Sequence, residues 1–149
     1  MKLAPLFAAE ITLAPPRELG TAPLGRRRII EITGGAFAGA RLSGKVLPGG
    51  ADWQLVRADG VAYLDTRYTL ETEDGALIYV QNRGYRHGPA EVIERLARGE
   101  AVDPASYYFR TSPWFETSTP KYGWLNRTIF VGAGARLADR VVLEVFEVE

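Results

Sequence analysis

Apolar and polar residues alternate along most of this chain, in short runs that end at turns rich in glycine and proline. The run 61–72 is the clearest example. Alternate side chains of an extended chain share a face, so one face of this run collects Ala62, Leu64, Thr66, Tyr68 and Leu70. Asp59-Gly60 and Asp74-Gly75 stand just outside its two ends, and Asp-Gly between alternating runs is typical of hairpins with a type I′ turn. The middle of the chain therefore predicts an antiparallel meander.

Similar runs predict about eight or nine strands at regular spacing. Their ranges are 3–12, 28–33, 40–47, 53–57, 61–72, 76–83, 105–111, 125–131 and 140–148. One segment predicts a helix, because Pro89 suits a first turn, apolar residues of 92–97 share a face and Gly99 can end it. This spacing indicates an all-β barrel or sandwich rather than βαβ units, with the helix closing a barrel end or packing outside.

Composition narrows the classes of function. The chain has 149 residues, which fits one domain over residues 1–149. Its 18 basic residues balance 18 acidic ones, so no net charge favours nucleic acid or an anionic membrane as a partner. No run reaches the roughly 20 apolar residues of a membrane span, and we expect a cytoplasmic protein. With no cysteine and a single histidine, His87, we predict no metal site and no cofactor.

An aromatic segment, residues 107–127, contains the richest set of candidate site residues. Arg110, Glu116 and Asn126 lie there among tryptophan, tyrosine and phenylalanine side chains, including those of Trp114, Phe115, Tyr122 and Trp124. Aromatic walls with a few polar groups are the usual makeup of a small-molecule pocket. Arg110 could clamp a carboxylate or enolate, and Glu116 could be a general acid or base if burial raises its pKa. Alternatively, Arg110 and Glu116 pair to brace a loop over an aromatic core.

Two further candidates lie in the meander. The apolar face of 61–72, with Tyr68, is either one wall of a ligand pocket or plain core. Asp52 and Trp53 follow two glycines and could present a carboxylate at a barrel rim. Equally, Asp52 could cap the turn while Trp53 packs in the core.

Turn and aromatic elements in a fixed order extend over nearly the whole chain. They include Pro48-Gly49-Gly50-Ala51-Asp52-Trp53, Asp59-Gly60, Asp74-Gly75-Ala76, Tyr108 to Arg110, Phe115-Glu116-Thr117 and Trp124-Leu125-Asn126. In these elements the chain resembles a bacterial and fungal family called domain of unknown function 3237, or uncharacterised protein family 0311. The resemblance implies an antiparallel up-and-down barrel of lipocalin-like appearance that assembles as a homo-oligomer, with no agreed activity. The positions that it maps are either a common site or shared barrel scaffolding: Asp52, Trp53, Arg110, Glu116, Tyr122, Trp124 and Asn126.

Three hypotheses about function follow. In the first, the barrel binds a small, partly aromatic metabolite that carries an anionic or carbonyl group. Arg110 and Asn126 would orient its oxygens, and the walls would be Trp53, Tyr68, Tyr122 and Trp124. In the second, the same pocket performs proton-transfer chemistry without a cofactor, such as isomerisation, cyclisation or hydration, with Glu116 or Asp52 as the acid or base. In the third, the chain is a structural module whose aromatic segment forms a subunit interface.

The three hypotheses require different structures. An enzyme requires a carboxylate that faces an enclosed cavity, within hydrogen-bond reach of a substrate. An interface module requires Trp114 and Trp124 to be buried against another chain, with no sizeable cavity.

Overall fold

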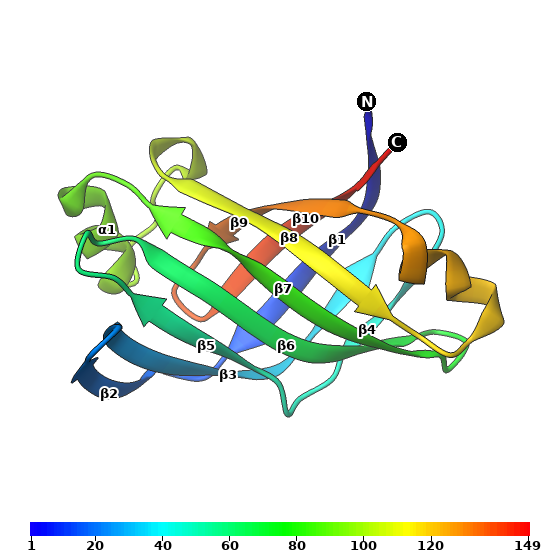
Figure 1. Ribbon diagram of the computed structural model, residues 1–149, viewed down its shortest axis with the longest axis horizontal. Helices are drawn as coiled ribbons and strands as arrows, with labels where there is room; N and C mark the ends of the chain where they lie inside the picture. The colour runs from blue at the N-terminus through cyan, green and yellow to red at the C-terminus, as the bar shows by residue number, and fades with distance from the viewer.

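The computed structural model describes residues 1–149, which form ten strands, one α-helix and two 3-10 helices (Figure 1). The strands are β1 (Leu3–Leu13), β2 (Arg17–Ala22), β3 (Gly25–Ala38), β4 (Ser43–Val46), β5 (Ala51–Val56), β6 (Ala62–Thr72), β7 (Leu77–His87), β8 (Tyr108–Glu116), β9 (Phe130–Arg136) and β10 (Arg140–Val148). The helices are α1 (Ala90–Ala97), η1 (Pro104–Ser106) and η2 (Pro120–Arg127). No helix is long and apolar enough to cross a membrane.

The strands close into an antiparallel barrel. Around the ring, β1 is followed by β10, β9, β8, β7 and β6, and β3 returns to β1. Between β6 and β3, the strands β4 and β5 share one position, because each pairs with β3 on one side and with β6 on the other. The barrel therefore has eight positions, and β2 forms an outer hairpin with β3. The predicted up-and-down barrel is confirmed.

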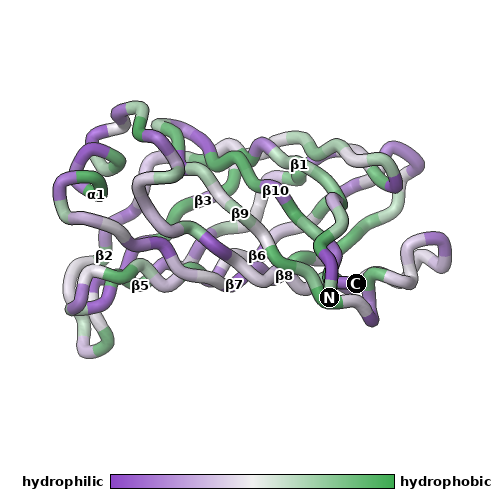
Figure 2. Tube along the Cα trace, turned by 90° about the horizontal axis from the view of Figure 1, so that it is seen from above, coloured by the Kyte–Doolittle hydropathy of each residue, from purple (hydrophilic) through white to green (hydrophobic).

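Closure of the ring depends on β1 and β3. The second half of β1 pairs with β10 on one side and with β3 on the other, from Ala8↔Ala38 to Leu13↔Ile32. Here β1 comes very close to Gly35 of β3, which has a φ of +139°. At the chain ends, Lys2 and Glu149 exchange two backbone hydrogen bonds of 2.9 Å, so the termini lie side by side (Figure 2).

Apolar side chains fill the barrel unevenly. A cluster of 19 buried residues, among them Phe115 and Leu125, fills the end that η2 covers. A second cluster of seven lies at the opposite end, where Val92 and Leu96 of α1 pack with Phe109. Figure 1 shows α1 and the gold η2 segment at opposite ends of the barrel. The predicted helix is thus confirmed as a cover for one barrel end.

The hairpins occur where the sequence predicts them, but the predicted type I′ turns are wrong. A type I′ turn needs a positive φ at both of its central residues. Only glycines have a positive φ in this protein, so Asp59 and Asp74 do not meet this requirement. In the hairpin between β5 and β6, the Gly60 N–H donates to Arg57 O and the Arg57 N–H donates to Val61 O. The loop is therefore one residue longer than the two-residue loop of a type I′ hairpin. The longer loop leaves the left-handed conformation to Gly60 alone, and the hairpin at Gly75 has the same pattern.

Several strand bounds also differ from the sequence prediction: 28–33 extends to Gly25–Ala38, 40–47 shortens to Ser43–Val46, and 105–111 shifts to Tyr108–Glu116. The expected strand 125–131 begins only at Phe130, because Leu125 belongs to η2 and inserts its side chain into the core. The short strand β2 was not predicted. All six of its residues are exposed, so its sequence has no alternation that would reveal a strand.

Gly35→Ala should destabilise the barrel strongly. An alanine Cβ would lie 2.0 Å from the Glu10 carbonyl oxygen, and its backbone would also be strained at the positive φ. We expect a loss of about 3 kcal/mol or more in the free energy of unfolding, measured by urea denaturation. Gly49→Ala is the matched control, since Gly49 has a φ of +103° but no atom within 4 Å of the new Cβ. Equal losses in the two variants would contradict a special role of the β1–β3 contact.

Candidate functional site

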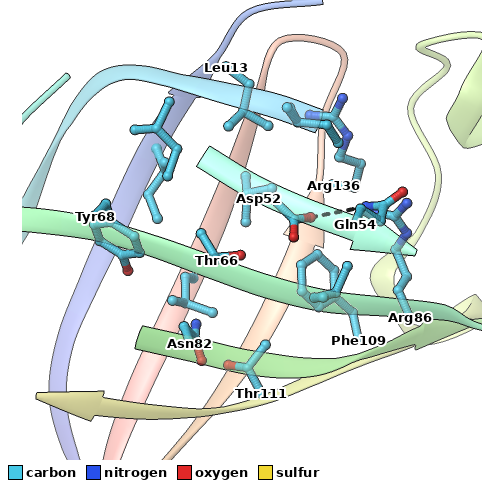
Figure 3. Close-up of a pocket in the computed structure, with 16 residues that line it drawn as sticks. Leu13, Asp52, Gln54, Thr66, Tyr68, Asn82, Arg86, Phe109, Thr111 and Arg136 are labelled. Atoms are coloured by element: carbon cyan, nitrogen blue, oxygen red, sulfur yellow. Dashed lines mark hydrogen bonds between the residues drawn. The ribbon is translucent and has the colours of Figure 1, made fainter. Parts of the chain in front are cut away.

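A small cavity lies inside the barrel between the two apolar clusters. It has a volume of about 60 Å³ and is lined by 16 residues from eight strands (Figure 3). Nine lining residues are hydrophobic; the others are the polar or charged residues Asp52, Gln54, Thr66, Asn82, Arg86, Thr111 and Arg136. In Figure 3, Tyr68 lies toward one end of the cavity, Arg86 and Arg136 lie toward the other, and Asp52 lies between them. The cavity is therefore the polar part of the interior.

Strand alternation places these polar groups inside. On β5, Asp52 and Gln54 line the cavity while Trp53 points to the outside. On β7, the buried Val80 is followed at two-residue intervals by Asn82 and later Arg86, which therefore share its inward face. The same alternation that fills one half of the barrel with apolar residues thus makes the other half polar.

Asp52 is the only carboxylate that lines the cavity. Its Oδ1 accepts a hydrogen bond of 3.0 Å from the Asp65 backbone N–H, and its Oδ2 accepts one of 3.1 Å from Gln54 Nε2. Gln54 is held in turn by Arg28, whose Nη1 donates to Gln54 Oε1 at 3.0 Å. Burial raises the pKa of Asp52, although these two hydrogen bonds act in the opposite direction. A fixed carboxyl group with a raised pKa is suited to giving and taking a proton.

Several other groups in the cavity have no partner within the protein. Asn82 Oδ1, Thr111 Oγ1 and Arg136 Nη1 are all buried and make no hydrogen bond. Burial raises the pKa of the Tyr68 phenol, so its hydroxyl stays protonated and can donate. Buried polar groups in folded proteins are nearly always hydrogen-bonded, so this concentration of unpaired groups marks a place for polar atoms from outside the chain.

Of the residues singled out from the sequence, the structure brings Asp52 and Tyr68 together in this cavity. Trp53 is 38% exposed on the outer surface. Arg110 is also outside, where it lines a surface hollow whose residues come mostly from β7, β8 and β9. Glu116 lies six residues further along β8, roughly 20 Å from Arg110, so the two neither pair nor share one ligand.

The remaining three residues lie at the η2 end and make contacts within the protein. Tyr122 is buried and donates its hydroxyl to Asp74, with O–O distances of 2.9 and 3.0 Å. Trp124 packs against the large apolar cluster, with the Arg41 guanidinium 3.6 Å from its ring centroid. Asn126 bonds both the N–H and the carbonyl of Thr117, at 2.8 and 2.9 Å. These contacts fasten η2 over the barrel end.

Sequence reasoning missed most of the polar lining. Gln54, Asn82, Arg86, Thr111 and Arg136 were not among the predicted site residues, although alternation carries a usable signal for some of them. Asn82 and Arg86, for example, have the same parity as the apolar residues at 78 and 80. No group of three or more His, Asp or Glu side chains is placed to hold a metal ion.

Comparison with known proteins places this fold and sequence among uncharacterised relatives. The family described as "Protein of unknown function (DUF3237)" matches residues 1–148. A UPF0311 protein of Rhodopseudomonas palustris is 52% identical over 131 residues, covering 88% of this chain and 84% of its own. A UPF0311 protein of Clostridium acetobutylicum is 44% identical over 149 residues, with coverage of 99% and 94%. A more distant relative, 28% identical over 144 residues with coverage of 97% and 81%, is the "Hydroalkoxylation enzyme phnH" of Penicillium herquei.

Solved structures agree with this fold. A conserved protein of unknown function from Rhodopseudomonas palustris superposes with a TM-score of 0.94 at 45% identity, covering 99% of this chain and 97% of its own. A β-barrel-like protein from Acinetobacter baumannii gives 0.87 at 52% identity, with coverage of 99% and 96%. An enzyme from Penicillium herquei gives 0.74 at 26% identity, with coverage of 99% and 94%.

Asp52→Asn should change how stability depends on pH. Because folding raises the pKa of Asp52, the folded protein holds a proton that the unfolded chain releases. Wild-type stability should therefore fall as the pH rises from about 4 through the folded pKa. The loss is roughly 1.4 kcal/mol for every tenfold by which folding tightens proton binding to this carboxyl. Asparagine does not titrate, so the stability of the variant relative to wild type should rise across this window in urea denaturation at a series of pH values.

Asp59→Asn is a control of opposite sign. A hydrogen bond from Arg57 lowers the pKa of Asp59, so this carboxylate stabilises the fold above its unfolded pKa and that stability is lost as the pH falls. The variant should lose stability relative to wild type as the pH rises. Parallel curves for wild type and Asp52→Asn would contradict a raised pKa at Asp52.

Proposed function

This chain belongs to the DUF3237 family, and we propose that it is an acid–base enzyme in which Asp52 transfers a proton to and from a small molecule held in the barrel interior. One observation carries the proposal: the Asp52 carboxyl faces a cavity whose other polar groups include several with no partner within the protein. This is the arrangement that the enzyme hypothesis requires. The predicted homo-oligomer and cytoplasmic location stay predictions.

Asp52 has the properties of a proton donor. Its raised pKa keeps a larger fraction of the carboxyl protonated at a given pH than in an exposed aspartate. Gln54 and the Asp65 N–H hold the two oxygens, so the group is oriented before a substrate arrives. After the proton leaves, the same two donors stabilise the carboxylate.

The unpaired groups supply recognition. Thr111 Oγ1 and the Tyr68 hydroxyl can donate to substrate oxygens, and Asn82 Oδ1 can accept from a substrate hydroxyl. Apolar lining from Ile30, Ile32 and Phe109 suits the hydrocarbon part of the same molecule. Larger substrates would need Arg86 and Arg136 to move, and neither side chain is held by a hydrogen bond.

Addition of the O–H bond of an alcohol or phenol across a carbon–carbon double bond is one reaction of this class, and hydroalkoxylation is the reaction in the name of the Penicillium herquei relative. Protonated Asp52 would give its proton to one alkene carbon, which leaves a cation on the other. The substrate hydroxyl oxygen then bonds to that carbon and loses its own proton to the Asp52 carboxylate. The π bond of the alkene and one O–H bond are replaced by one C–O and one C–H bond, and the acid is regenerated.

Asp52→Asn should slow this reaction strongly. We expect purified protein to convert ortho-prenylphenol or a related alkenyl phenol into its cyclic ether, with one deuterium gained on carbon in deuterium oxide. The variant should be slower by roughly 100-fold or more, because asparagine cannot donate a proton. Mass spectrometry measures both the product and its isotope content.

Asp59→Asn is the matched control, since Asp59 is an exposed aspartate of the turn between β5 and β6, pairs with Arg57 and does not touch Asp52. Its rate should equal that of wild type. Turnover that survives in Asp52→Asn would contradict the role of Asp52, and saturable binding without turnover would favour the ligand-binding hypothesis.

A further inference from the structure

A second hollow lies beneath α1, next to the interior cavity. This outer hollow has a volume of about 370 Å³ and lies between the helix residues Ile93 and Leu96 and the rim of the barrel. Two residues, Arg86 and Arg136, line both the outer hollow and the interior cavity. They therefore lie at the boundary between the two spaces.

Five arginines line the outer hollow, and three of them have carboxylate partners. Arg26 and Arg28 lie 3.7 and 2.9 Å from Glu18, and Arg98 lies 2.6 Å from Glu100. No carboxylate lines the outer hollow itself. These ion pairs offset the charges of Arg26, Arg28 and Arg98, whereas Arg86 and Arg136 have no such pair.

Arg86 and Arg136 have neither an ion pair nor a side-chain hydrogen bond. Burial, followed by the positive charge of Arg136, lowers the pKa of Arg86 to about 10. Burial and the charge of Arg28 lower the pKa of Arg136. The charge of Asp52 opposes both shifts, but its carboxylate forms an ion pair with neither guanidinium. Two neighbouring cations are thus held partly buried with no carboxylate in ion-pair contact, which is an unfavourable arrangement for the protein alone.

We propose that Arg86 and Arg136 together bind the acidic group, a carboxylate or a phosphate, of an organic acid that enters beneath α1. The planar guanidinium group offers parallel N–H donors that match the oxygens of either acid. The apolar body of the ligand extends into the interior among Ile30 and Phe109, toward Asp52. This inference rests on the proposed function for the use of Asp52, but binding of the acid itself does not require proton transfer.

A structural brace predicts a different behaviour for the free protein. If Arg86 only supported the fold, Arg86→Gln would lower the melting temperature. Its guanidinium has no ion pair and makes only a long cation–π contact, 5.8 Å from the Phe109 ring centroid. As a ligand-binding residue it should therefore leave the melting temperature nearly unchanged or raise it, because the variant removes a partly buried charge. Arg28→Gln is the matched control: it removes the contacts to Glu18 and Gln54 and should lower the melting temperature.

Calorimetric titration of the full chain with benzoate, phenyl phosphate and benzyl alcohol tests the inference. Either acid should bind more tightly than the neutral alcohol, and the tighter one identifies the acidic group. Arg86→Gln and Arg136→Gln should each weaken its binding roughly tenfold to 100-fold. Arg98→Gln removes an arginine of the outer hollow that is already paired with Glu100, so it should weaken the binding of the acid only a few-fold.

Three results would each overturn the inference. They are benzyl alcohol binding as tightly as the acids, no binding of either acid, and a loss of affinity in Arg98→Gln as large as in Arg86→Gln.

Asp52→Asn separates this inference from the proposed function. Acid binding that survives in Asp52→Asn and is lost in Arg86→Gln supports the arginine site even if no turnover is found. Turnover that depends on Asp52 but not on either arginine supports the enzyme and refutes the acid site.

Discussion

Pairing of β1 with β3 determines what the interior of this protein can be. Once β1 lies between β10 and β3, the sheet has no gap at that point, and every inward side chain on eight strand positions is enclosed. An enclosed interior must be filled by apolar groups or contain polar groups that find partners. The end beneath η2 is filled by apolar groups, with Phe115, Phe130 and Leu125 almost fully buried. The end beneath α1 is neither fully apolar nor fully paired, because it contains polar groups and several of them have no partner.

The polar half of the interior contains several polar groups that the protein itself does not pair. Gln54 is held on both sides, because it links Arg28 to Asp52. Asn82, Thr111 and Arg136 each retain a buried atom with no partner, and Arg86 forms no ion pair. Such departures from good packing lower stability, and natural proteins concentrate them at functional sites. A ligand that supplied an acidic group and an oxygen would satisfy them, so binding and stability should be coupled.

Much of the fold could be predicted from the sequence. Alternation in residues 61–72 grouped Tyr68 with the apolar residues of one face, which the structure turns inward, and the ordered turn elements indicated the barrel family. The site was predicted less well. The aromatic segment looked like one cluster because its residues are close in the sequence, but β8 sends Arg110 and Glu116 outward while Phe109 and Thr111 point inward. Arg86 and Arg136 are 50 positions apart, and only the order of the strands around the barrel brings them to one opening. Local patterns carry no information on that order.

A crystal structure of the protein grown with benzoate tests the central claim most directly, because it shows whether an outside molecule completes the polar half of the barrel. We predict that the benzoate carboxylate lies between the guanidinium groups of Arg86 and Arg136, with its ring directed toward Asp52. We also predict that Asn82 and Thr111 gain partners from the ligand or from water that it orders. An interior in which both arginines turn to Asp52 and benzoate is absent would contradict the account.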